Sequence, residues 1–276
     1  MTDTTYAALP AVPGTGEGAP GDPLRIAVIA ASVRDQRMGR AIAEWAAFRA
    51  APAGADSPRA DSSDTGSSHT GSSHTGSSHA GSSHAGSSHA GSSNTGSSNT
   101  GASNTGSRSA GSRSAGSARA DASQAEVDLI DCAETDLPDD GLLRPGASAG
   151  TAVSARIDAA DAFVFVTPEY NHSYPAGLKR LIDWHYREWM FKPATVLSYG
   201  VQGGLLATEH LRGVLAELHV VTTRRVVGLS RPWTDLSPAG YTPPADIAEA
   251  FDAALHELTW WASMLRTARH ERPYAR

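Results

Sequence analysis

Short runs of apolar residues alternate along the chain with stretches in which apolar residues recur every three or four positions. Such runs are typical of parallel strands that are buried on both faces of a sheet. They lie at residues 25–31, 127–130, 162–167, 194–199 and 220–227, and the run at 127–130 is the weakest. The pattern therefore predicts five strands.

Between these runs the apolar spacing is that of amphipathic helices. Leu178, Leu181, Ile182 and His185 stand at i, i+3, i+4 and i+7, on one face of a helix. Comparable spacing predicts further helices near residues 38–49, 211–218 and 247–265, with a weaker one at 150–160. Strands that alternate with helices predict an α/β fold, in which a parallel sheet has helices on both faces.

A low-complexity segment interrupts this alternation between the first helix and the second strand. Eleven of the 27 glycines recur every five residues from Gly66 to Gly116, in units such as Gly-Ser-Ser-His-Thr. Residues of these types have little apolar area to offset the entropy lost on ordering. We therefore expect a disordered insert at 51–122 and a disordered tail at 1–23, with one folded domain over 24–270.

Composition and charge exclude several classes of protein. The only cysteine is Cys132, so the chain has neither a disulfide framework nor a thiolate zinc site, and we expect this thiol to be inert. No apolar run approaches the roughly 20 residues that cross a bilayer, and the first residues do not form a secretion signal. A formal net charge of −6 argues against nucleic-acid binding. We expect a cytoplasmic protein with no membrane or nucleic-acid partner.

The predicted topology indicates where a ligand would bind. In open parallel sheets, ligands lie at the carboxyl ends of the strands, beside the point where the strand order reverses. With the order 2-1-3-4-5, the loops after strands one, three and four flank that point. These three loops are also the unusual ones in the sequence.

The loop after the first predicted strand, at residues 31–40, has the composition of a phosphate site. It carries the hydroxyl of Ser32 and the guanidinium groups of Arg34 and Arg37 just before a helix begins. The partial positive charge at a helix start favours a phosphate. The loop is neither a Walker A motif nor a GxGxxG motif. An ordinary polar loop with surface arginines is the alternative.

The loop after the third predicted strand, at residues 167–175, is stiffened by two prolines. The flat side chains of Tyr170, His172 and Tyr174 suit the border of a planar heterocycle, and Asn171 suits its polar edge. A turn that leads into a helix would have the same composition.

The loop after the fourth predicted strand contains Gly200, Gly203 and Gly204. Glycines at a strand-to-helix turn let a backbone approach a ligand closely. Close packing of the helix on the sheet would also select them.

Taken together, the three loops resemble those of the NADPH-dependent FMN reductase family. The resemblance rests on Ser32-Val33-Arg34 with Arg37 and Gly39, on Pro168-Glu169-Tyr170-Asn171 followed by Leu178-Lys179, and on the turn from Tyr199-Gly200 to Gly203-Gly204. It implies a flavodoxin-like three-layer sandwich with a five-stranded parallel sheet in the order 2-1-3-4-5. Ala31 departs from the pattern, because the family usually has glycine there.

The resemblance also implies which residues hold FMN. It assigns the phosphate to the first loop, the isoalloxazine ring to the second, and the pyrimidine edge to the glycine turn. The implied residues are Ser32, Arg34, Arg37 and Gly39 for the phosphate, Pro168, Glu169, Tyr170 and Asn171 for the ring, and Tyr199, Gly200, Gly203 and Gly204 for the edge.

The activity implied by the resemblance is that of an FMN-dependent oxidoreductase. A hydride passes from NADPH or NADH through FMN to a small-molecule acceptor, which is a quinone, a flavin, an azo compound or a metal oxyanion. The flavin carries the redox chemistry, so we nominate no catalytic side chain. The family also implies a homodimer or homotetramer.

Two alternatives stay open. One is a flavodoxin-like protein that only transfers electrons. The other is a metal-binding protein that uses the repeat histidines His69, His74, His79, His84 and His89.

Overall fold

The computed structural model describes residues 18–19, 21–52, 125–143 and 151–274. The predicted tail at 1–23 and insert at 51–122 therefore lie outside the described residues, apart from 18–19, 21–23 and 51–52. Both stay predictions. Among the described residues, no helix is both long enough and apolar enough to cross a membrane.

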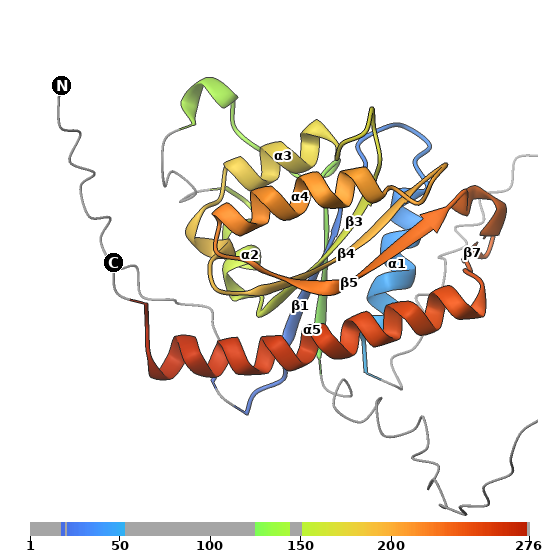
Figure 1. The fold of residues 1–276 in the computed structure, drawn as a ribbon. Coiled ribbons are helices and arrows are strands. Elements are labelled where there is room, and N and C mark those ends of the chain that lie inside the picture. Colours follow the sequence, from blue (N-terminus) through green and yellow to red (C-terminus); the bar gives the residue numbers. More distant parts are fainter. Residues whose placement is uncertain (1–17, 20, 53–124, 144–150, 275–276) are drawn as a thin grey trace, which may run out of the picture. The chain divides into compact units, whose positions relative to one another are not determined.

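A five-stranded parallel sheet in the order β2-β1-β3-β4-β5 forms the middle layer (Figure 1). The strands are β1 (Arg25–Ala30), β2 (Glu126–Asp131), β3 (Ala162–Pro168), β4 (Pro193–Gly200) and β5 (Val221–Ser230). All seven residues of the central strand β3 are buried, as expected for a strand covered on both faces. The predicted fold class and strand order are confirmed.

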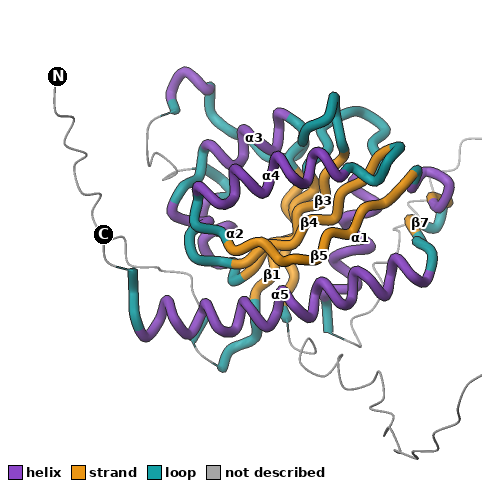
Figure 2. Tube along the Cα trace, viewed as in Figure 1, coloured by secondary structure: helices purple, strands orange, loops and turns teal. Residues whose placement is uncertain are grey.

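Helices cover both faces of this sheet (Figure 2). One layer contains α1 (Gly39–Ala50) and α5 (Ala245–Glu271), and the other contains α2 (Ser154–Ala159), α3 (Ala176–Asp183) and α4 (Leu205–Glu217). Short 3-10 helices occupy Asp140–Leu142, Arg187–Trp189 and Pro232–Asp235, and a small hairpin pairs β6 (Leu236–Ser237) with β7 (Gly240–Tyr241).

The alternation of side chains along each strand produces two separate cores. On β3, Val164 and Val166 belong to the core beneath α1 and α5, whereas Phe163 and Phe165 belong to the core beneath α2, α3 and α4. The second core is closed by Trp189, whose ring lies 4.8 Å from that of Phe163. Burial on both faces explains why the sequence of β3 is continuously apolar.

Helix α3 is shorter than its apolar pattern predicted. The pattern placed His185 on the helix, but α3 ends at Asp183. The buried imidazole of His185 donates from Nδ1 to the Leu181 carbonyl at 2.7 Å, and its Nε2 lies 2.6 Å from Thr151 Oγ1. Burial lowers the pKa of His185. His185 is therefore a hydrogen-bonded core residue. Its burial explains why it continues the apolar spacing, although it lies beyond the end of the helix.

A buried ion-pair cluster fastens α5 to the amino-terminal ends of β1 and β3. The fully buried carboxylate of Asp161 accepts from the backbone N–H of Arg25 at 3.0 Å, from Arg266 at 3.3 Å and from Arg269 at 3.2 Å. Arg266 also donates to the carbonyls of Asp22 and Pro23. This cluster lies at the end of the sheet opposite the loops that follow β1, β3 and β4.

Candidate functional site

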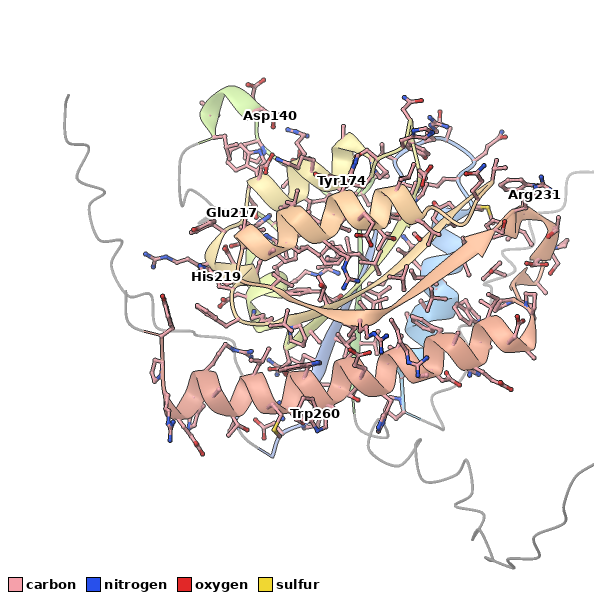
Figure 3. The ribbon with its side chains drawn as sticks, in the orientation of Figure 1. Asp140, Tyr174, Glu217, His219, Arg231 and Trp260 are labelled. Carbon is pink, nitrogen blue, oxygen red and sulfur yellow. The ribbon has the colours of Figure 1, made fainter. Side chains whose placement is uncertain are left out.

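Three loops meet at the carboxyl ends of β1, β3 and β4, which are adjacent strands. We call them the first loop (31–38), the second loop (169–175) and the glycine turn (201–204). In Figure 3, His219 precedes β5 on the left and Arg231 follows it on the right, so the carboxyl ends of the parallel strands face right. The structure thus brings together the three loops that the sequence singled out.

The first loop, which leads into α1, contains backbone N–H groups that are available to donate hydrogen bonds. Within the described part of the chain, the backbone N–H groups of Ser32, Val33 and Arg34 donate to no protein acceptor. Helix α1 follows directly, without a side-chain cap from Met38 and without an acidic residue in its first turn. Free N–H groups at the positive end of a helix are the chemistry of an anion site.

Ser32 links the first loop to the second. Its buried Oγ lies 2.9 Å from the Tyr170 hydroxyl. The guanidinium carbon of Arg34 lies 3.7 Å from the centroid of the Tyr170 ring, a cation–π contact that holds this otherwise exposed arginine at the loop surface. Tyr170 therefore positions two of the predicted phosphate-binding residues.

Gly39 begins α1 in very close contact with the end of β4. A Cβ at this position would stand 2.3 Å from the Tyr199 hydroxyl oxygen and 2.9 Å from Ser32 Cβ. Only glycine fits there without a shift of the buried Tyr199 or of the first loop. Burial raises the pKa of the Tyr199 hydroxyl, which therefore stays protonated at neutral pH.

Arg37 forms an ion pair with Asp131, a residue that the sequence did not single out. Its Nη2 lies 2.6 Å from Oδ2 of Asp131, the last residue of β2, and Arg40 Nη1 reaches the same oxygen at 3.2 Å. The Arg37 Nε atom is buried and has no hydrogen-bond partner among the described residues. A buried donor left in this state costs about 1–3 kcal/mol unless an acceptor meets it.

Cys132 follows Asp131 directly. Burial raises the pKa of its thiol to about 12, so the thiol is protonated at neutral pH. This agrees with the expectation that Cys132 is not a reactive thiolate.

The second loop folds into a tight turn. Tyr170 and Ser173 exchange two backbone hydrogen bonds, of 2.8 and 3.0 Å, around Asn171 (φ 49°) and His172 (φ 65°). Two successive positive φ angles define a type I′ turn, a conformation that asparagine tolerates well. Asn171 lies exposed at the tip. The geometry of the turn is thus enough to explain the asparagine at position 171, a residue that the sequence also assigned to a ring-binding loop.

Glu169 lies between the second loop and α4. Its Oε2 accepts from the backbone N–H groups of Leu206 at 3.1 Å and Ala207 at 3.4 Å, in the first turn of α4. Its own N–H donates to the Tyr199 carbonyl at 2.9 Å. The side chain therefore caps α4, a role that the sequence did not predict. Pro168 is buried beside Tyr199 at the end of β3.

The glycine turn is shaped by backbone requirements. Gly203 and Gly204 have φ angles of 79° and 72°, which favour glycine, and a Cβ on Gly204 would lie 2.8 Å from the Tyr199 nitrogen. The Gly203 carbonyl accepts from Ser198 Oγ at 2.7 Å. Gly200 packs next to Glu169: a Cβ built on Gly200 would lie 3.5 Å from the Cβ of Glu169. The glycines thus allow the start of α4 to pack directly against the end of β4.

Apolar side chains are exposed on the first loop, on the glycine turn, in the first turn of α4 and in the 3-10 helix after β5. They are Val33, Val201, Leu205, Leu206 and Trp233. A groove of about 570 Å³ lies elsewhere, between α3 and α4, and its lining from Lys179 to Leu218 includes none of the predicted site residues. We place the candidate site at the three loops, because the free donors and the close glycine contacts are there.

Among the described residues, no group of three or more His, Cys, Asp or Glu side chains is placed to hold a metal ion. The repeat histidines lie outside the described residues.

Comparison with known proteins matches residues 90–234 to the family model of NADPH-dependent FMN reductases. An NAD(P)H-dependent FMN reductase of Saccharomyces cerevisiae is 38% identical over 117 residues, covering 42% of this chain and 58% of that protein. A quinone reductase of Escherichia coli is 40% identical over 80 residues, covering 27% of this chain and 43% of the relative. The chain thus spans about half the length of the curated relatives it matches.

Among solved structures, the flavoenzyme NAD(P)H:(acceptor) oxidoreductase FerB of Paracoccus denitrificans superposes with a TM-score of 0.52. It is 18% identical, and the match covers 87% of this chain and 98% of that one. At this identity the likeness concerns the fold.

Proposed function

This chain belongs to the NADPH-dependent FMN reductase family, and from that premise we propose that it is an FMN-dependent oxidoreductase. It binds FMN at the carboxyl ends of β1, β3 and β4, takes a hydride from NADPH or NADH, and reduces a small-molecule acceptor. Relatives named as FMN reductases and quinone reductases support this class of activity.

The residues at the three loops fit a bound flavin mononucleotide. The observation that carries the proposal is the first loop, where backbone N–H groups and the buried Nε of Arg37, all without an acceptor in the described part of the chain, lie near the start of α1. An anion with several acceptor oxygens satisfies such donors together, and a phosphate monoester is one. Ser32, Arg34, Arg37 and Gly39 form this part of the site.

The second loop and the glycine turn form the part that borders the flavin ring. The type I′ turn and Pro168 limit the conformations of the backbone at Tyr170 and Asn171, so little order has to be gained on binding. Gly200, Gly203 and Gly204 border the other edge together with the backbone of Tyr199, whose side chain is buried. Glu169 acts by holding α4 against this edge through its cap.

FMN, when bound, supplies the hydride and electron chemistry. The chain's own residues position the phosphate and the ring and keep the Tyr199 hydroxyl neutral. We assign no side chain as general acid or base, because a reduced acceptor can take protons from water.

The exposed apolar side chains around the loops favour a planar, largely apolar acceptor such as a quinone or a second flavin. A homodimer or homotetramer remains a prediction from the family.

The phosphate assignment is tested by Arg34→Ala. Loss of a charge-assisted hydrogen bond to the phosphate should weaken FMN binding by about 1.5–3 kcal/mol, roughly ten- to 150-fold, and leave riboflavin binding nearly unchanged. Isothermal titration with both ligands measures this.

The matched control is Arg224→Ala, which removes a positive charge from an exposed position on β5. It should affect neither ligand. Equal losses of FMN and riboflavin in Arg34→Ala would mean that Arg34 supports the fold of the loop and does not contact the phosphate.

A further inference from the structure

A buried carboxylate stands beside the proposed phosphate site, on the neighbouring strand. The register of the sheet places Asp131, at the end of β2, next to Ala30, at the end of β1, so Asp131 faces the start of the first loop. Its side chain is 1% exposed. A buried carboxylate requires several hydrogen-bond donors, because it has lost its contacts with water.

Asp131 receives its donors from the first loop and α1. Arg37 Nη2 donates to Oδ2 at 2.6 Å, Arg40 Nη1 donates to the same oxygen at 3.2 Å, and the Ala133 N–H donates to Oδ1 at 3.0 Å. Of the two arginines, Arg37 is the more buried, at 19% exposure against 37% for Arg40. Arg40 is also shared with Glu44 and Glu134.

The pairing fixes one edge of the Arg37 guanidinium and leaves another donor unmet. Nε of Arg37 is buried and has no acceptor among the described residues. An ion pair that served only to stabilise the fold would not require this orphaned donor. An anion bound in the first loop would supply the missing acceptor.

We propose that Asp131 is a positioning residue for the phosphate of the cofactor. It acts through Arg37, by holding the guanidinium so that its remaining donors serve the phosphate. The inference rests on the proposed function, because the phosphate is that of FMN.

Simple electrostatics and the positioning role predict opposite signs for one substitution. Asp131→Asn removes a negative charge near a phosphate, so electrostatics alone predicts tighter FMN binding. The positioning role predicts at least tenfold weaker FMN binding, with riboflavin affinity within twofold of the parent. Titration of the apo-protein with FMN and with riboflavin distinguishes the two.

Glu134→Gln is the matched control. Glu134 is an exposed carboxylate that pairs with Arg40 at 2.9 Å, and no contact links it to Arg37 among the described residues. Its substitution should not weaken FMN binding. A loss as large as that of Asp131→Asn would overturn the proposal, because any carboxylate near the loop would then suffice.

A double-mutant cycle tests whether Asp131 acts through Arg37. Arg37→Gln should weaken FMN binding, and adding Asp131→Asn to it should have no further effect. The proposal is overturned if the two effects multiply, if Asp131→Asn leaves FMN affinity unchanged or raised, or if it weakens FMN and riboflavin equally.

Arg37→Lys keeps the claim testable should Asp131→Asn fail to fold. Lysine retains the charge opposite Asp131 but has a single nitrogen, so it should lose FMN affinity as Arg37→Gln does. FMN affinity at the parent value in Arg37→Lys would overturn the proposal. A parent protein that binds no FMN would overturn the proposed function as well, whereas parent binding with an unaffected Asp131→Asn overturns this inference alone.

Discussion

At residue 39, the absence of a side chain lets α1 begin against the Tyr199 hydroxyl. An added Cβ would meet that oxygen at 2.3 Å, so Gly39→Ala must displace Tyr199 or the first loop. We expect the free energy of unfolding to fall by about 1–3 kcal/mol, as for other overpacked sites, and FMN binding to weaken. Urea unfolding of the apo-protein and FMN titration measure the two effects.

Gly213, in another helix, has room for a side chain where Gly39 has none. It lies within α4, and, apart from its two chain neighbours and the backbone of its own helix, no atom of the described residues comes within 4 Å of a Cβ built there. Gly213→Ala should therefore stabilise the protein by up to about 1 kcal/mol, the usual gain from alanine in a helix interior. If Gly39→Ala also stabilised the protein, the close contact with Tyr199 would not exist in solution.

Some residues of the candidate site are easier to single out from the sequence than others. Ser32 and Arg34 lie close together in the chain at a strand-to-helix loop, so local composition was enough to single them out, whereas Gly39 came from the family resemblance. Asp131 could not be found in this way. Its contact with Arg37 depends on the register of β1 with β2, the strand whose apolar pattern was weakest.

At the scale of elements, the carboxylate of Glu169 joins the end of β3 to the start of α4. It accepts hydrogen bonds from two N–H groups in the first turn of α4. The N-cap residue of this helix is Gly204, which has no side chain to cap them. Glu169→Ala should therefore lower the free energy of unfolding by about 1 kcal/mol, the usual cost of a lost cap. Urea unfolding of the apo-protein measures this.

Glu209→Ala is the control for charge, because Glu209 is exposed on the same helix. Its effect should stay within about 0.5 kcal/mol. A Glu169→Ala variant as stable as Glu209→Ala would show that the cap contributes nothing, and would return the side chain of Glu169 to the ring-binding role implied by the family.

The boundaries of elements were less predictable than their order. Strand β5 runs to Ser230, beyond the predicted end at 227, because Gly200 of β4 pairs with Ser230. Helix α3 stops before His185, which enters the core through its two hydrogen bonds. Apolar periodicity records which side chains are buried, and a buried residue after a helix looks the same as one within it.

At the scale of the whole molecule, the layered fold followed from the alternation of buried runs and amphipathic stretches. Strand β3 supplies both cores from one continuous apolar run. The place of the candidate site was expected from the topology, because the loops after β1, β3 and β4 share one edge of the sheet. The repeat segment lies outside the described residues, and its disorder stays a prediction.

We propose that this chain binds FMN and lets NADPH or NADH reduce it. The most direct measurement is the absorbance spectrum of the FMN-loaded protein without oxygen, before and after adding the nicotinamide, and again after adding a quinone. We predict bleaching of the flavin by the nicotinamide and its return with the quinone. Flavin that bleaches only with dithionite would contradict the reductase and favour an electron carrier, and a protein that retains no FMN would contradict the site itself.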